Sequence, residues 1–229
     1  MQKQALLAAS VFLVGGLAAT MPPVAQAQEL LAPSSYQTSQ QLNRLLATGR
    51  QLVDAGDFSD AIAFYQQAAI LEPKNPRIYA GIGYLQARQR NFSAAAAAYR
   101  QAIALAPKDA HFQYALGYVL ANAGDNAGAA TAYLRAIQLN HKDINAYLGF
   151  GVVLFRQGKY NDALRAYQQV VAIAPNNARA YELRGAIFRQ QGHSIEAIAD
   201  LSRARNLYKR QGYIQGIQRV EAMLQELHP

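Results

Sequence analysis

The chain repeats itself with a period of about 34 residues, and this period restricts the possible folds more than any other feature. A shift by one period aligns glycine with glycine and alanine with alanine over five successive segments. The two series are Gly49, Gly83, Gly117, Gly151 and Gly185, and Ala61, Ala95, Ala129, Ala163 and Ala197. A unit of this length cannot bury its apolar face alone, so neighbouring units must stack. We therefore predict five stacked units at 42–75, 76–109, 110–143, 144–177 and 178–211.

Further residues recur with the same interval and suggest a helical hairpin in each unit. An aromatic series comprises Tyr65, Tyr99, Tyr133 and Tyr167, with Leu201 in the fifth unit. Glycines at 56, 124, 158 and 192 stand where a first helix would end, because glycine adopts the left-handed conformation of a helix C-cap. We expect each tyrosine of a second helix to fill the space left by the small residues of a neighbouring helix.

This pattern resembles the tetratricopeptide repeat (TPR), a helix–turn–helix unit of about 34 residues, and the resemblance covers about three quarters of the chain. It implies an all-α, right-handed α-solenoid of five TPR units. Apolar residues then recur every three or four positions within 212–229, at Ile214, Ile217, Val220, Leu224 and Leu227. This spacing predicts a capping helix on the fifth unit. The alternative is a helix that binds in a groove of another protein.

The N-terminal segment has the order of a secretory signal peptide. A basic residue, Lys3, precedes an uncharged and mostly apolar stretch at 5–21, and alanine occupies both small-residue positions of a cleavage site at Ala25 and Ala27. We predict a signal peptide at 1–27; the alternative is an uncleaved membrane anchor formed by residues 5–21. Either would place the remaining chain across a membrane, in a periplasm, a lumen or the exterior. Residues 28–41 lack periodicity and are predicted to form a flexible linker.

Neither composition nor motifs suggest an enzyme. The chain contains no Cys, which excludes a cysteine nucleophile and a thiolate zinc site, and its four histidines are not spaced as metal ligands on one helix face. We expect no catalytic residue, no metal and no cofactor. The net charge of +8 suggests an acidic partner. Nucleic acid is disfavoured, because an exported protein meets little of it and the basic residues do not form one stripe.

The resemblance to TPR proteins implies that the first helices line a concave groove that holds peptides or partner helices. We select ten candidate peptide-binding residues: Arg50, Arg77, Tyr84, Arg88, Tyr114, Tyr118, Asn122, Arg156, Arg179 and Arg189. Arginine holds carboxylates in a bidentate manner, and aromatic faces add apolar contact. We therefore expect a non-catalytic scaffold or assembly factor that binds an extended acidic segment of an exported or membrane protein.

Two alternatives to this groove remain open. In the first, the arginines are simply solvated and the true contacts lie elsewhere. In the second, the chain is a membrane-anchored TPR scaffold for the assembly of a membrane protein complex. Its basic residues Arg203, Arg205, Lys209 and Arg210 would then face anionic lipid.

Overall fold

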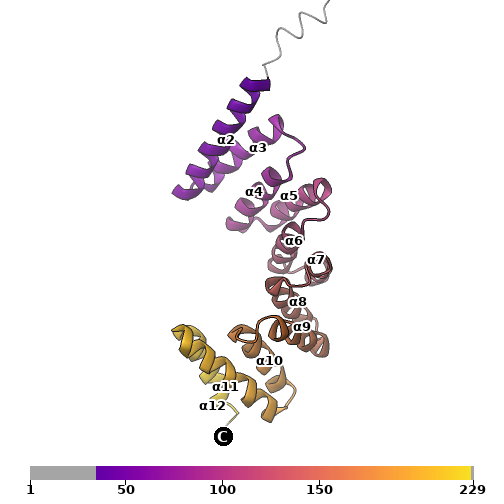
Figure 1. The fold of residues 1–229 in the computed structure, drawn as a ribbon, viewed down its shortest axis with the longest axis vertical. Coiled ribbons are helices and arrows are strands. Elements are labelled where there is room, and N and C mark those ends of the chain that lie inside the picture. Colours follow the sequence, from indigo (N-terminus) through magenta and orange to yellow (C-terminus); the bar gives the residue numbers. More distant parts are fainter. Residues whose placement is uncertain (1–34, 228–229) are drawn as a thin grey trace, which may run out of the picture. The chain divides into compact units, whose positions relative to one another are not determined.

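The computed structural model describes residues 35–227, and over this range it is helical without any strand (Figure 1). Eleven helices follow one another within these residues. They are α2 (Ser35–Ala55), α3 (Phe58–Leu71), α4 (Pro76–Arg88), α5 (Phe92–Leu105), α6 (Ala110–Asn122), α7 (Asn126–Leu139), α8 (Ile144–Arg156), α9 (Tyr160–Ile173), α10 (Ala178–Gln190), α11 (Ser194–Gln211) and α12 (Ile214–Gln225). The predicted all-α class is therefore confirmed.

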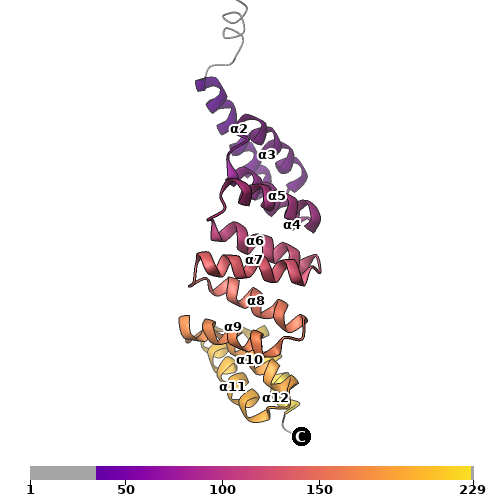
Figure 2. The same cartoon turned by 90° about the vertical axis from the view of Figure 1, so that its right-hand side faces the viewer.

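The chain divides into two compact units, Met1–Gln40 and Gln41–Pro229, and the second contains all five repeats. Within it, successive helices from α3 to α12 pack on one another, and α4 also contacts α6, which in turn contacts α8 (Figures 1 and 2). Helices α4, α6, α8 and α10 are first helices of repeats, and α5, α7, α9 and α11 are second helices. The first helices thus lie next to each other in the middle of the array.

Two predictions concern the chain ahead of the repeats. The predicted signal peptide or anchor at 1–27 lies outside the described residues. The linker predicted at 28–41 is wrong for residues 35–41, because α2 begins at Ser35. Gln and Leu form helices readily, and the sequence from 35 to 48 contains neither Gly nor Pro to end one.

The tyrosine of a second helix packs against glycines of two first helices, as the repeat pattern predicts. A methyl group added at Gly117 would lie 2.8 Å from a ring carbon of Tyr133, and one added at Gly149 would lie 2.4 Å from the Cζ of the same ring. Tyr65 has the same relation to Gly49 and Gly81. Overpacking of this kind typically costs about 1–3 kcal/mol. Glycine at these positions is therefore a packing requirement, since it lets tyrosine fill the interface.

The start of each first helix after α2 is fixed by an N-cap that recurs with the period of the repeat. Asn75, Asp109, Asp143 and Asn177 precede α4, α6, α8 and α10, and each side chain accepts a hydrogen bond from a backbone N–H of the first turn. Such a cap contributes about 1 kcal/mol. These caps set the register of the first helices and hence the positions of the side chains that they carry.

Candidate peptide-binding groove

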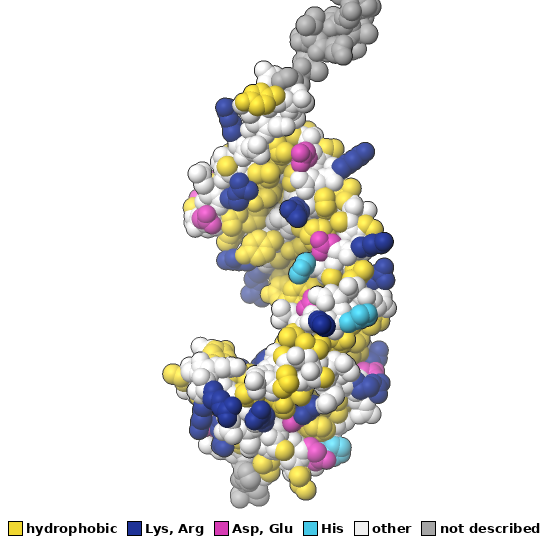
Figure 3. Space-filling model, in the orientation of Figure 1, with side chains coloured by type: hydrophobic (Ala, Val, Ile, Leu, Met, Phe, Trp, Pro, Cys, Tyr) yellow, Lys and Arg dark blue, Asp and Glu magenta, His cyan; other side chains and the backbone are white. Residues whose placement is uncertain are grey.

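The structure places all ten candidate residues on first helices. Arg50 lies on α2, Arg156 on α8, and the other eight lie on α4, α6 and α10. Because α4 contacts α6, the structure brings together the candidates on these two helices. In Figure 3, apolar surface is exposed among basic side chains over the part of the chain formed by α2 to α6.

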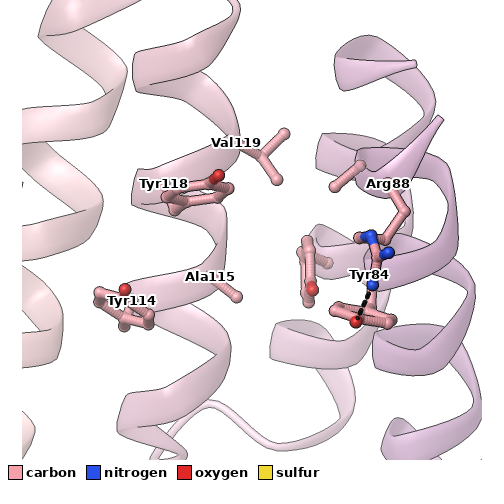
Figure 4. Close-up of a pocket in the computed structure, with 8 residues that line it drawn as sticks. Tyr84, Arg88, Tyr114, Ala115, Tyr118 and Val119 are labelled. Atoms are coloured by element: carbon pink, nitrogen blue, oxygen red, sulfur yellow. Dashed lines mark hydrogen bonds between the residues drawn. The ribbon is translucent and has the colours of Figure 1, made fainter. Parts of the chain in front are cut away.

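A pocket of about 400 Å³ lies between α4 and α6 (Figure 4). We call it the tyrosine pocket; its lining comprises Tyr84, Ala87, Arg88, Tyr99, Tyr114, Ala115, Tyr118 and Val119. Ala115 and Val119 project from α6 toward α4, as Figure 4 shows. Small side chains on both helices leave this space open, whereas Tyr84 and Tyr118 remain 46% and 50% exposed. Four predicted site residues thus meet in one cavity.

Arg88 is held in place at this pocket without an ion pair to any described residue. Its Nη1 donates a hydrogen bond of 2.7 Å to the hydroxyl of Tyr84, as the dashed line in Figure 4 marks. Its guanidinium carbon lies 4.8 Å from the ring centroid of Phe58 and 5.7 Å from that of Tyr84. These contacts orient the guanidinium through cation–π attraction and leave its charge exposed at the pocket.

The phenol groups of Tyr99 and Tyr114 are uncharged at neutral pH. Burial, together with the neighbouring Tyr84, raises the pKa of Tyr99 to about 12. Burial also raises the pKa of Tyr114, and nearby Asp143 and Tyr118 add to this effect. A neutral phenol can both donate and accept a hydrogen bond. The lining is therefore apolar over the ring faces, with polar hydroxyl groups and one cation.

The remaining candidates on α2, α4, α6 and α8 differ in how far they are engaged. Arg50 and Arg77 are exposed, and neither side chain forms an ion pair or a hydrogen bond with another described residue. Arg156 is also exposed, but its Nη1 donates to the backbone oxygen of Ala121 at 3.1 Å and so links α8 to α6. Asn122 donates to the backbone oxygen of Tyr118 at 2.7 Å, within its own helix.

The two candidates on α10 have acidic partners inside the protein. Arg179 pairs with Glu182 at 2.9 Å, and Arg189 pairs with Glu226. The side chain of Glu182 is only 4% exposed. Arg179 and Arg189 are thus occupied by ion pairs within the chain.

Glu182 is the centre of a cluster that also contains Arg179, Tyr208 and Arg219, which we call the Glu182 cluster. Arg219 Nε donates to Glu182 Oε1 at 2.9 Å, and the hydroxyl of Tyr208 donates to Oε2. Burial on its own would raise the pKa of Glu182, but the hydrogen bonds from Arg219, Tyr208 and Arg179 lower it below the usual value. The cluster joins α10, α11 and α12. The repeat pattern does not predict this cluster, because Arg219 lies outside the repeats.

Residues 35–227 contain neither a metal-binding cluster nor a membrane-spanning helix. No group of three or more His, Asp or Glu residues in this range is arranged to hold a metal ion. Across the same range, no helix is both long enough and apolar enough to span a bilayer.

Comparisons with known proteins identify the repeats. Residues 46–110 and 81–144 match the family model described as tetratricopeptide repeat, and residues 151–192 match a second model described as TPR repeat. These matches cover more than half of the chain, which therefore belongs to the tetratricopeptide repeat family. A TPR repeat-containing protein of Picosynechococcus sp. is 40% identical over 68 residues, which are 30% of this chain and 18% of that protein. The chain thus spans less than a fifth of the length of this relative.

Solved structures with the same fold cover most of both chains. A crystal structure of MamA aligns with a TM-score of 0.69 and 25% identity, over 72% of this chain and 96% of that one. MamA from residue 41 to its end, from Desulfovibrio magneticus RS-1, aligns with a TM-score of 0.71 and 16% identity, over 75% of this chain and 97% of that one. YrrB, described as a TPR protein with an unusual peptide-binding site, aligns with a TM-score of 0.64 and 21% identity, over 77% of this chain and 90% of that one. The chain is therefore a right-handed α-solenoid that contains tetratricopeptide repeats.

Proposed function

We propose that the protein is a non-catalytic scaffold whose first helices hold an extended acidic segment of another protein. One observation carries this proposal: Arg50, Arg77, Arg88 and Arg156 are all exposed on first helices, and none has an ion-pair partner among the described residues. Among the described residues, Arg179 and Arg219 pair with Glu182, and Arg189 pairs with Glu226. Unpaired guanidinium groups beside exposed aromatic rings are well suited to bind carboxylates of a partner.

The fold supports a protein rather than a small molecule as the partner. First helices packed side by side present a long surface, and the description of YrrB names a peptide-binding site in a protein of the same fold. The order of residues 1–27 supports a target that is exported or resides in a membrane, because a signal peptide would bring this chain to the same compartment. Retention of 5–21 as an anchor would instead make the protein a membrane-anchored assembly scaffold.

The experiment that tests this function compares two charge-reversal variants in their capture of partners from the native host. The groove variant is Arg77→Glu with Arg88→Glu on α4. The control variant is Arg100→Glu with Arg135→Glu, which changes the net charge equally but on the second helices α5 and α7, where both side chains are exposed. Cross-linking and mass spectrometry identify the captured segment, and intact mass shows whether residues 1–27 are present.

We expect the groove variant to lose its partner and the control variant to keep it, with the cross-linked segment rich in Asp and Glu. An equal loss in both variants would show that only net charge matters, because long-range attraction does not depend on which face carries the arginines. Unchanged capture by the groove variant would reject the groove itself. Circular dichroism must show the same helix content in all three proteins.

A further inference from the structure

We infer that the tyrosine pocket is the anchor site of this groove and accepts one large apolar side chain that has a carboxylate next to it in the bound segment. This inference rests on the proposed function and names the sequence feature that the groove selects. It follows from the size of the pocket, from the chemistry of its lining and from the position of Arg88.

The pocket has room for a large side chain and little to attract a polar one. Its volume is about 400 Å³, whereas a cavity of about 150 Å³ is sufficient for benzene. Ala87, Ala115 and Val119 supply aliphatic surface, and buried Tyr99 supplies an aromatic one. Burial of an aromatic or long aliphatic side chain there would stabilise the complex by removing apolar surface from water.

A cage of tyrosine rings often binds a quaternary ammonium group, but Arg88 argues against that ligand here. A cation binds such rings through their faces, within about 6 Å of the ring centroid. The guanidinium of Arg88 already occupies a position 5.7 Å from the Tyr84 centroid and hydrogen-bonds to its hydroxyl. A second cation would be repelled by this charge. An uncharged apolar group meets no such penalty, so it is the ligand that the pocket favours.

The same guanidinium sets the chemistry beside the anchor. Arg88 uses one donor on Tyr84 and keeps others, since a guanidinium has five N–H groups. Arg77 lies near the start of the same helix and Arg88 at its end, which corresponds to about 16 Å along the helix axis. An extended segment covers that distance in about five residues. The expected ligand therefore has an apolar residue flanked by acids, with another acid about five residues away.

The absence of Trp from the chain makes this ligand directly measurable. The probe is the acetylated and amidated peptide Asp-Ser-Ser-Ser-Asp-Trp-Asp-Ser-Ser-Ser-Asp, which is symmetrical in charge because the direction of binding is open. Its indole is then the sole tryptophan fluorophore in the sample. Three matched peptides are titrated as competitors: one with Ala in place of Trp, one with Ser in place of every Asp, and one with trimethyllysine in place of Trp.

We expect the emission of the probe to shift to shorter wavelength and the Ala peptide to bind about tenfold more weakly, which corresponds to about 1.4 kcal/mol. The variant Tyr118→Ser should lower affinity for the Trp probe about tenfold and leave the affinity for the Ala peptide unchanged. Tyr118 is half-exposed, so this variant is expected to fold. Tyr36→Ser, which changes a more exposed tyrosine on α2, is the matched control and should bind like the unmodified protein.

The other outcomes separate the inference from the function on which it rests. Equal affinity for the Ala and Trp peptides would overturn the anchor site and leave the acidic groove standing. Equal affinity for the Ser and Asp peptides would overturn the carboxylate beside the anchor and the acidic preference of the groove. Tighter binding of the trimethyllysine peptide would overturn the choice of a neutral side chain. No binding of any peptide would overturn both proposals.

Discussion

Arg90 adopts a left-handed backbone conformation at a position that glycine occupies in the other four repeats. It has a φ of 64°, and the equivalent residues Gly56, Gly124, Gly158 and Gly192 have φ values of 87°, 88°, 73° and 78°. The left-handed conformation costs a residue with a Cβ roughly 1–2 kcal/mol. The side chain of Arg90 is exposed and forms no ion pair or hydrogen bond with another described residue. No contact of this side chain within residues 35–227 therefore offsets the cost.

We therefore predict that Arg90→Gly stabilises the protein by about 0.5–1 kcal/mol, because glycine removes the strain but gives the unfolded chain more freedom. Thermal and urea unfolding followed by circular dichroism measure the change. The reciprocal substitution, Gly124→Arg, should destabilise by about 1–2 kcal/mol. Since nothing lies within 4 Å of a Cβ added at Gly124, that loss would report the backbone alone. A destabilised Arg90→Gly protein would show that Arg90 has a stabilising role that its geometry does not reveal.

Residues that follow the period could be predicted, and residues that depend on side-chain direction could not. The contact of Tyr133 with glycines of two helices follows from the sequence, because the same pair recurs in other repeats. The interaction partners of the arginine side chains do not follow from the sequence in this way. Arg88 stacks on Phe58, whereas Arg179 pairs with Glu182, although the sequence predicted the same groove-facing role for both. The partner of an arginine side chain depends on its rotamer and on the distance between neighbouring helices. The spacing of residues in the sequence specifies neither of these.

Helix α12 closes the apolar end of the array. Val220 and Leu224 are buried in one cluster with Leu207 and Tyr208 of α11, so α12 covers a face that a further repeat would otherwise cover. The spacing of apolar residues predicted such a helix. The Glu182 cluster adds a polar connection across α10, α11 and α12 that this spacing does not reveal, because its members come from three separate helices.

We predict that Glu182→Gln lowers the free energy of unfolding at pH 7 by about 1–2 kcal/mol, because it removes a buried charge that accepts hydrogen bonds from three side chains. The loss is moderate because solvent screens Arg179 and Arg219, which are 47% and 42% exposed. Urea unfolding measures it. Glu221→Gln is the control: Glu221 pairs with Lys209 at 3.6 Å on the surface, so its loss should stay below about 0.5 kcal/mol.

The same substitution should change how stability depends on pH. The native pKa of Glu182 lies below its usual value, which is about 4.3 in an unfolded chain. Its carboxylate therefore stabilises the fold above about pH 4.3, and this contribution disappears as the pH falls through the native pKa. We expect the unmodified protein and Glu182→Gln to differ at pH 7 and to converge on acidification. A difference that stays constant down to pH 3 would show that charge is not the cause.

Contacts across the array are local in sequence. Among the described residues, every extensive contact joins helices that are one or two places apart in the chain. The largest apolar cluster joins α5, α6, α7 and α8 and contains Tyr99, Tyr133 and Val153. Stability in such an array approximates a sum of repeat and neighbour terms, so the middle and the ends need not unfold together.

We predict that amide hydrogen exchange is slowest in α6 and α7, which have packed neighbours on both sides, and fastest at the start of α2, where residues 35–41 include no buried side chain. Exchange measured by mass spectrometry on peptides from each helix tests this order. Helix α12 should exchange more slowly than α2 because the Glu182 cluster holds it, and Glu182→Gln should remove that difference. Equal protection of all helices would show a single cooperative unit.

The tyrosine that contacts two glycines also governs how a gene for this protein can lengthen. Tyr133 contacts Gly117 of its own repeat and Gly149 of the next, so each junction depends on a fixed separation between a tyrosine and a small residue further along the chain. A tandem copy of 110–143 would place the Ala115 of the copy opposite Tyr133, and this alanine already lies beside Tyr99 at the junction before it. Duplication of that segment keeps the separation between the tyrosine and its small partner, whereas an insertion of another length between these two residues changes it. Growth by whole repeats thus preserves the residue spacing on which each of these junctions depends.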